Sequence, residues 1–321
     1  MADLRSNFGL LIKGVAAKAS EVFDQAAMTY KIDVPAFYKQ RSDDAQQYNV
    51  SGLTSGGLLT KRAEQANYST GRRHKTYDTN YIHTNYSKRF ELSMEMLQDR
   101  DFNGVFDESR QQRIMADFFR QRALFQVFNG GFGTSSTVNG VDLTRYGDGV
   151  ALFSTAHPRV DGGSSQSNAS STGIPLTEAN LETGRIALAK QLLDDGTPIV
   201  DLGRIWLVVP TDLEKTAKII TGSNLRSGTA NNDMNIYNDG SFPVLSTHLL
   251  SSANGGSNTA WFLVAENASK ILFVDRLAPQ LVSARADHGG MYFDVDTRAS
   301  FGHSHWIGTY GSKGDNAAYS G

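Results

Sequence analysis

Cysteine is absent from this 321-residue chain, and proline is scarce. The lack of cysteine excludes a disulfide scaffold, a cysteine-ligated zinc site and thiol catalysis. With 7 prolines against 31 glycines, the chain is expected to turn often and to contain few stiff, proline-rich linkers. The formal net charge of −2 provides no overall field that would direct the protein to nucleic acid or to an acidic membrane.

Long apolar runs are missing as well. No run approaches the roughly 18–20 residues that a membrane span requires, and the first residues lack the basic-then-apolar layout of a signal peptide. We therefore expect a protein that is made in the cytoplasm and does not enter a membrane. The length allows one large domain or two ordinary ones, with a sizeable core.

Two stretches show the apolar period of about 3.6 residues that is typical of helices. The first covers residues 8–23, and the second, residues 101–130, is longer. For the second helix the sequence predicts an N-cap at Asp107 or Ser109 and an end at Asn129-Gly130-Gly131. We expect this helix to be the spine of a domain, with four arginines on or beside its polar face: Arg110, Arg113, Arg120 and Arg122.

The middle of the chain predicts an α/β layer. A helix from residue 177 to about 193 precedes the apolar run 205–210, which predicts a strand buried on both faces, and a helix over 211–222 follows. Two further apolar runs, 261–265 and 271–274, predict short strands.

The C-terminal segment predicts a β-hairpin. Residues 293–301 alternate strictly between apolar or small side chains and polar ones, as a half-buried strand does. Residues 281–285 predict the strand before it, and Gly289-Gly290 the turn. Because this hairpin and the spine helix flank the α/β layer, we expect a discontinuous domain.

Residues 42–90 have few apolar side chains and cannot build a core of their own. From residue 61 to 90, seven Lys and Arg face two acidic residues, a net of +5. Two interpretations are open: a flexible surface loop, or a long β-hairpin arm whose Tyr and Arg contact another subunit. The residues predicted to make such contacts are Lys61, Arg62, Tyr68, Arg72, Arg73, Lys75, Tyr77 and Tyr81.

Candidate catalytic residues are few. Ser154 and His157 lie three apart but lack the G-x-S-x-G elbow that exposes a nucleophile, so we expect His157 to order a turn by hydrogen-bonding to the backbone. No phosphate-binding glycine motif occurs either.

Candidate metal ligands are equally few. His303 and His305 fall on one face of an extended strand, downstream of Asp287 and His288, but no third ligand is specified. A polar strand face with Trp306 at its edge explains them as well, and Asp194-Asp195 predicts a solvated turn. We expect no catalytic residue, no cofactor and no metal.

Three segments carry a resemblance to a known family. They are Ala151-Leu152-Phe153-Ser154-Thr155-Ala156-His157-Pro158, Trp206-Leu207-Val208-Val209-Pro210 and Phe90-Glu91-Leu92-Ser93-Met94-Glu95-Met96-Leu97-Gln98-Asp99. In this order the chain resembles the major capsid proteins of tailed bacteriophages with the Hong Kong 97-type fold, and the local likeness is clearest to the Mu-like major head subunit. The resemblance covers about residues 90 to 315, and it treats 90–99 as a strand leading to the spine helix.

The resemblance implies an α+β fold with five segments. Residues 1–45 would be an N-terminal arm, 46–92 an extended β-hairpin loop lying over a neighbouring subunit, and 146–279 an inserted axial α/β domain. The peripheral domain with the long spine helix would combine 93–145 with 280–321.

The resemblance also implies a function. The chain would be a major capsid (head) protein, not an enzyme, that assembles as hexamers and pentamers into an icosahedral shell around double-stranded DNA in the bacterial host cytoplasm. Its partners would be a portal protein, a separate scaffolding protein and a possible decoration protein. The alternatives are an encapsulin-type nanocompartment shell that packages a protein cargo, a His-dependent hydrolase or metal enzyme, and a surface-layer protein, which the missing signal peptide disfavours.

Overall fold

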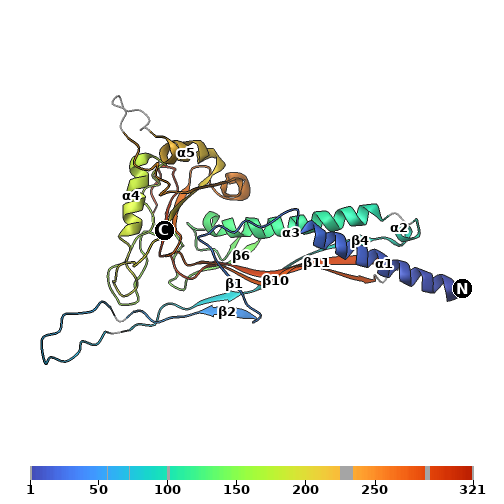
Figure 1. Cartoon of the computed structure of the whole chain (residues 1–321), viewed down its shortest axis with the longest axis horizontal. Coiled ribbons are helices and arrows are strands. Elements are labelled where there is room, and N and C mark those ends of the chain that lie inside the picture. The colour runs from blue at the N-terminus through green and yellow to red at the C-terminus, as the bar shows by residue number, and fades with distance from the viewer. Residues whose placement is uncertain are drawn as a thin grey trace.

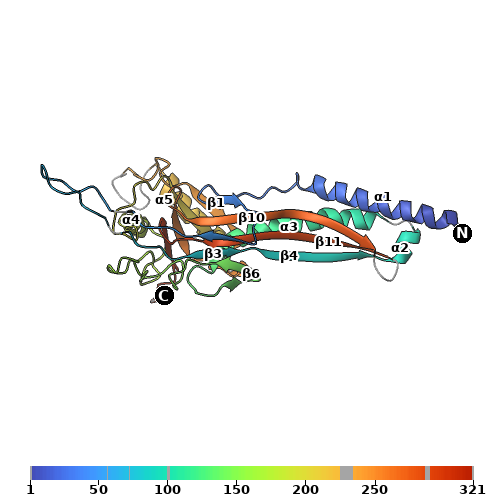
Figure 2. The same cartoon turned by 90° about the horizontal axis from the view of Figure 1, so that it is seen from below.

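The computed structural model describes residues 2–55, 57–71, 73–99, 102–224, 234–285 and 290–319. The molecule is elongated and has three parts (Figure 1, Figure 2). The rod comprises α1, α2 and α3 with the long strands β4, β10 and β11; the block comprises residues 146–268 and 304–319; and the extended loop, residues 51–78, projects beside the block. None of the helices among the described residues is long and apolar enough to cross a membrane.

A six-stranded sheet runs through the rod. Its long strands are β10 (Ile271–Arg285), β11 (Met291–His303) and β4 (Thr84–Leu92), and β11 lies between the other two, antiparallel to both. β11 alternates buried and half-buried side chains from Met291 to Ala299, which confirms the predicted strand. Shorter strands complete the sheet near the block: β1 (Lys39–Ser42), β5 (Thr137–Val138) and β6 (Val141–Thr144).

β10 is a single strand where the sequence predicted two. The predicted strands 271–274 and 281–285 are its two ends, and its pairing with β11 shifts register twice between Asp275 and Gln280, around Pro279. Among the described strands, β11 alone pairs with it beyond Asp275, since β1 ends at Ser42. The expected domain boundary between residues 279 and 280 therefore falls inside a continuous strand.

Helix α3 (Asn103–Asn129) covers one face of the rod sheet, and α1 (Ala2–Ala26) packs beside it (Figure 2). Both helices were predicted from their apolar period. The predicted N-caps of α3 are wrong, because the helix begins four residues before Asp107 and Ser109 donates its hydroxyl to the Val105 carbonyl within the helix. The end at Asn129-Gly130 is confirmed.

The arginines of α3 are not all on a polar face. Arg120 is 5% exposed and forms an ion pair with Asp275 of β10, while Arg113 pairs with Asp117 and donates to the Pro279 carbonyl. The predicted polar face is wrong here because α1 and the sheet together cover more of the helix than one apolar stripe requires. The aliphatic stems of arginine allow such burial when the guanidinium finds a partner.

The segment between β4 and α3 is helical. The resemblance implied a strand over residues 90–99, but the strand ends at Leu92 and α2 spans Met94–Asp99. Ser93 accepts a hydrogen bond from the Met96 backbone through its hydroxyl, which is the arrangement of a helix N-cap. The expectation of a continuous strand is therefore wrong.

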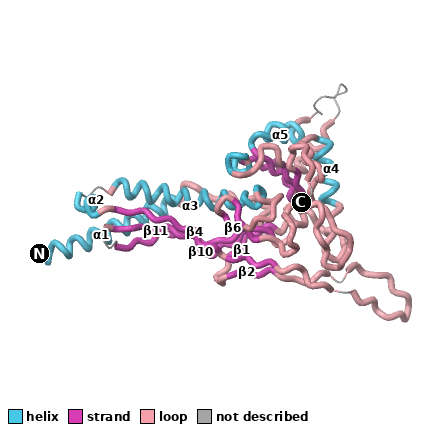
Figure 3. The backbone as a smooth tube through the Cα atoms, turned by 180° about the vertical axis from the view of Figure 1, so that it is seen from behind, coloured by secondary structure: helices cyan, strands magenta, loops and turns pink. Residues whose placement is uncertain are grey.

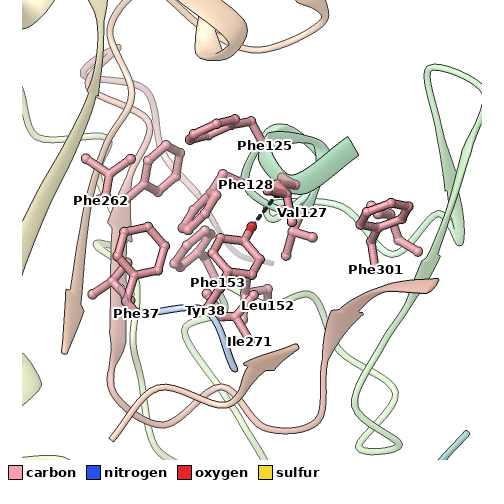
Figure 4. Close-up of a cluster of buried hydrophobic side chains, with 14 of the residues drawn as sticks. Phe37, Tyr38, Phe125, Val127, Phe128, Leu152, Phe153, Phe262, Ile271 and Phe301 are labelled. Carbon is pink, nitrogen blue, oxygen red and sulfur yellow. Dashed lines mark hydrogen bonds between the residues drawn. The ribbon is translucent and has the colours of Figure 1, made fainter. Parts of the chain in front are cut away.

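The main core lies where the rod meets the block (Figure 4). The ring of Phe128 from α3 faces those of Phe37, Phe153 and Phe262, with centroid separations of 6.0, 6.4 and 5.2 Å. All four rings are at most 2% exposed. Gly131 permits this packing, because a Cβ there would lie 2.6 Å from the Phe153 ring. The Phe153 segment is thus a core element.

A four-stranded sheet in the order β12-β9-β7-β8 organises the block. The predicted strand β7 (Ile205–Pro210) lies inside it, antiparallel to β9 (Trp261–Ala265) and parallel to β8 (Val244–Thr247). Helices α4 (Glu178–Ala189) and α5 (Glu214–Gly222) confirm two predictions, although α4 ends four residues before Leu193. The sequence predicted a loop where β8 lies. The strand is short and its four residues are half-buried, so no apolar pattern marks it among its polar neighbours.

β12 (Thr309–Ser312) completes the block sheet by pairing with β9. The chain therefore leaves the block along β10, turns back along β11 and re-enters the block at its C-terminal end. The segment after residue 280 thus contributes to both sheets, through β10 and β11 in the rod and β12 in the block.

Candidate intersubunit surface

The extended loop grows out of a short antiparallel ladder. β2 (Gln47–Val50) pairs with β3 (Thr79–Ile82), and backbone hydrogen bonds continue the ladder from Thr76 to Gly52 and from Thr54 to His74. Beyond this point the loop runs as irregular backbone away from the body (Figure 3). The predicted β-hairpin is therefore correct for the root of the loop only.

The outer part of the loop, residues 57–71, is exposed at every described position. Leu58 and Leu59 are 73% and 104% exposed. The guanidinium of Arg62 lies 4.3 Å from the centre of the Tyr68 ring, and this is a local contact that buries little surface. The outer loop has no core of its own, as its composition predicted.

The residues predicted to contact a neighbour differ in accessibility. Five of them are exposed and available for a contact between chains: Lys61, Arg62, Tyr68, Arg73 and Lys75. Of these, Lys75 already pairs with Asp78 at 2.5 Å. Arg72 lies outside the described residues.

The two remaining tyrosines lie at the root of the loop. Tyr77 is half-buried and packs edge-on against Tyr146 of the block, with centroids 5.5 Å apart. Tyr81 is fully buried against Tyr48 and Leu272, and burial raises the pKa of its phenol well above the ordinary value. Tyr81 therefore supports the loop root and has no surface to offer a neighbour, so its prediction as a contact residue is wrong.

The root of the loop is fastened to the block. The Ser55 hydroxyl donates to the Asp195 carboxylate, and a cavity of about 520 Å³ lies beside this contact, lined by loop residues such as Leu53 and block residues such as Val200. Burial alone would raise the pKa of Asp195, but hydrogen bonds from Ser55 and Thr197 outweigh it and lower the pKa. The carboxylate is thereby held in its charged form at the point where the loop leaves the block.

The Ser154–His157 pair is buried in the block. Nδ1 of His157 lies 2.8 Å from Oδ2 of Asp148, and Nε2 lies 3.0 Å from Oδ1 of Asn168. The expected bond from the ring to the backbone is therefore wrong; only the main chain of His157 pairs with the main chain, at Gln166. A ring that is 1% exposed with both nitrogens engaged is poorly placed to serve as a general base.

The His303 and His305 side chains have separate roles. His305 donates from Nε2 to Oδ2 of Asp194 at 3.1 Å and accepts from the Ile307 backbone at Nδ1. Burial, aided by the charge of Arg145, lowers the pKa of His303 well below the ordinary value. In the described part of the chain no group of three or more His, Asp or Glu is arranged to hold a metal ion, and Asp287 and His288 lie outside that part.

Two neighbours of these histidines are buried where the sequence predicted exposure. Asp194 is 5% exposed and accepts a hydrogen bond from the Tyr146 hydroxyl at 3.0 Å, so it is no solvated turn. Trp306 is 1% exposed and stacks on His157 with ring centroids 4.4 Å apart, so it is no edge residue. Sequence reasoning also missed Asp148 and Asn168, because their partners are distant and neither stands in a motif.

Comparisons with known proteins bear on the fold and the family. The mature capsid of bacteriophage PhiM1 is 10% identical, with a TM-score of 0.54 over 88% of this chain and 87% of that chain. The Mycobacterium phage Patience structure is 11% identical, with a TM-score of 0.53 over 98% and 90%, and the capsid of the native GTA particle is 11% identical, with a TM-score of 0.52 over 91% and 93%. At these identities the likeness shows a common fold.

No curated protein matches the chain. A family model described as phage capsid protein matches residues 76–307, which is more than two thirds of the sequence. The matched range begins in the loop root and includes the spine helix, most of the block and the long strands. The mixed helix-and-sheet architecture agrees with the structural likenesses to phage capsids. The chain belongs to the phage capsid protein family.

Proposed function

We propose that the chain is the major capsid protein of a tailed bacteriophage, with the Hong Kong 97-type fold and related to the Mu-like major head subunit. Copies of the chain assemble as hexamers and pentamers into an icosahedral shell that encloses double-stranded DNA. One observation carries the proposal: the outer loop is exposed throughout, including Leu58 and Leu59. An isolated subunit has no means to cover these side chains, and a second copy does.

The proposed domain plan follows the pairing of the strands. Residues 1–45 form the N-terminal arm, 46–92 the extended loop, 93–145 the first part of the peripheral domain, and the axial domain begins at 146. The continuity of β10 supports a return to the peripheral domain at about residue 271 instead of 280. The pairing of β12 with β9 supports assigning residues 309–319 to the axial domain.

The charge distribution suits a wall that encloses DNA without reading its sequence. The chain as a whole carries a net charge of −2, while Lys61, Arg62 and Arg73 of the loop are exposed. Each phosphate contact made by a basic residue adds salt-sensitive affinity, so a nearly neutral wall holds DNA weakly. The exposed cations of the loop instead form ion pairs with carboxylates on the block of a neighbouring subunit.

The partners that this function requires are a portal protein, a separate scaffolding protein and, in some shells, a decoration protein. Assembly takes place in the cytoplasm of the bacterial host. The proposal assigns the chain no catalytic step, no cofactor and no metal, in keeping with a family whose members are structural proteins.

The direct test is electron microscopy of the purified protein, expressed alone and with candidate scaffolding partners. The proposal predicts closed shells of tens of nanometres whose capsomers have six-fold and five-fold symmetry. A monodisperse monomer or small oligomer that assembles under neither condition would refute it. Reconstruction of the shell also tests whether residues 57–71 lie on a second copy.

The content of the shells separates the two kinds of shell protein. A phage capsid incorporates a portal at one vertex and packages DNA when it is produced with its packaging partners. A nanocompartment instead retains a protein cargo and has no portal. Mass spectrometry of shells isolated from the native source, together with nuclease-protected DNA analysis, decides between the two.

A further inference from the structure

The orientation of the Asn168 amide is fixed by backbone groups. Its Oδ1 accepts from the Ser154 backbone N–H at 2.8 Å, and its Nδ2 donates to the Leu152 carbonyl at 2.7 Å and to the Thr309 hydroxyl at 3.1 Å. A backbone N–H only donates and a backbone carbonyl only accepts, so the amide cannot be turned over. The atom that faces Nε2 of His157 is therefore an acceptor, and Nε2 must carry a proton.

The other nitrogen of His157 also faces an acceptor. Nδ1 lies 2.8 Å from Oδ2 of Asp148, while Oδ1 of the same carboxylate accepts from the Val150 backbone at 3.2 Å. A second proton is therefore required between His157 and Asp148. Imidazole is the stronger base by roughly 2–3 pH units in water, which places this proton on the ring.

The surroundings favour this charge on His157 and disfavour a second charge beside it. The Trp306 ring lies nearly parallel to the imidazole, with an interplanar angle of 12°, as in a cation–π contact. The neighbouring His305 accepts at Nδ1 from a backbone N–H, which fixes it as the neutral tautomer. Burial, followed by the charge of Arg145, lowers the pKa of His303 well below its ordinary value.

We propose that His157 is held as an imidazolium in a buried ion pair with Asp148, and that this proton fastens the turn 147–150 to Asn168 within the block. The pair joins the turn 147–150 to Asn168, and Asn168 in turn holds Thr309 at the start of β12. Trp306, stacked on the ring, lies in the connection between β11 of the rod and β12 of the block. The inference holds for any shell that the chain builds.

Removal of this proton would destabilise the folded chain. A neutral His157 would leave one ring nitrogen lone pair facing either the Asp148 carboxylate or the Asn168 carbonyl oxygen, in a site where the side chains of His157 and Asp148 are 1% exposed.

The first test reads the proton directly. The protein is labelled with ¹⁵N histidine, and the ring nitrogens of sedimented protein are measured by solid-state NMR at pH 7, with His157 assigned through its connection to Ala156. We expect two protonated ring nitrogens on His157 and one on His305. A single protonated nitrogen on His157 overturns the proposal, and this measurement needs no variant.

The second test removes the need for the proton. In Asp148→Asn the amide oxygen keeps the bond to the Val150 backbone, and the amide nitrogen donates to Nδ1 of a neutral His157. We expect the same NMR measurement at pH 7 to show one protonated ring nitrogen on His157 in this variant, against two in the wild type. His305→Gln is the matched control and should keep two protonated ring nitrogens on His157. Two protonated ring nitrogens on His157 in Asp148→Asn overturn the proposal.

Discussion

The outer loop and the His157 junction, formed by Asp148, His157 and Asn168, are both poor in apolar residues, yet the loop is exposed and the junction is buried. Residues 57–71 are exposed at every described position, whereas Asp148, His157 and Asn168 are buried with their polar atoms paired. The junction lies beside an aromatic core, so its polar groups are removed from water and pair with one another. The loop has no such surroundings within the subunit, so its side chains are left for a partner.

The largest expected effect is on assembly, because removal of the outer loop should stop shell formation without destabilising the subunit. Replacing residues 58–70 by a short Gly-Ser link should abolish shell formation, while the melting temperature of the subunit stays within about 2 °C because no core contact is removed. Electron microscopy and thermal unfolding provide the two measurements. Leu58→Ser with Leu59→Ser is the length-matched control and should weaken assembly without shortening the loop. Shells from the deleted variant would remove the distinction between the regions.

A core substitution should act in the opposite manner. Phe128→Ala removes a ring that touches three other buried rings, and we expect a loss of about 3–5 kcal/mol in the free energy of unfolding. Met115→Ala on the same helix is the control, because Met115 is 57% exposed, and it should cost less than about 1 kcal/mol. Chemical denaturation of the unassembled subunit measures both. Equal losses in the two variants would contradict the assigned core.

Acid should destabilise the folded chain through His303. Because burial lowers the pKa of His303 in the folded chain, the unfolded chain binds more protons once the pH falls below about 6.5, and the folded state loses stability from there downward. Thermal unfolding between pH 7 and pH 5 should show this loss, and His303→Gln should reduce it. His83 has a pKa that burial also lowers, so part of the loss should persist in the variant. An unchanged acid profile in His303→Gln would assign the loss elsewhere.

The smallest effects on folding are expected from single loop side chains. Tyr68→Ser should change the free energy of unfolding by less than about 0.5 kcal/mol, because Tyr68 is 82% exposed. Tyr77→Ser is the matched variant at the root and should cost more, since that ring packs on Tyr146. Denaturation curves measure the free energy of unfolding, and light scattering measures the effect of each variant on assembly. Similar folding losses in both variants would show that the outer loop is packed.

The sequence predicted elements whose signal is local. The apolar period of α1 and α3, the unbroken run of β7 and the alternation of β11 each depend on residues within one element. It did not predict that β10 is continuous, because the polar stretch around Pro279 interrupts its apolar pattern. Nor did it predict the start of α3, since Phe102 occupies the cap without a side-chain hydrogen bond.

The intersubunit surface was predicted only in part, because its composition is a local signal and the burial of its side chains is not. Composition alone indicated a basic, tyrosine-rich loop without a core, but it could not separate Tyr68, which is exposed, from Tyr81, which is buried. The burial of Asp194 and Trp306 depends on segments more than a hundred residues apart. Pairings over such separations leave no mark in a single sequence.

The free edge of β10 has a consequence for how copies of the chain avoid one another. Beyond Asp275 this strand has no second pairing partner among the described strands, so its outward backbone groups could template a strand from another molecule. Pro279 lacks a backbone N–H, and the two register shifts around it bend the strand away from a flat edge. These two features therefore disfavour the edge-to-edge pairing of β10 strands from different copies, which would otherwise lead to fibres at the high local concentration of a forming particle.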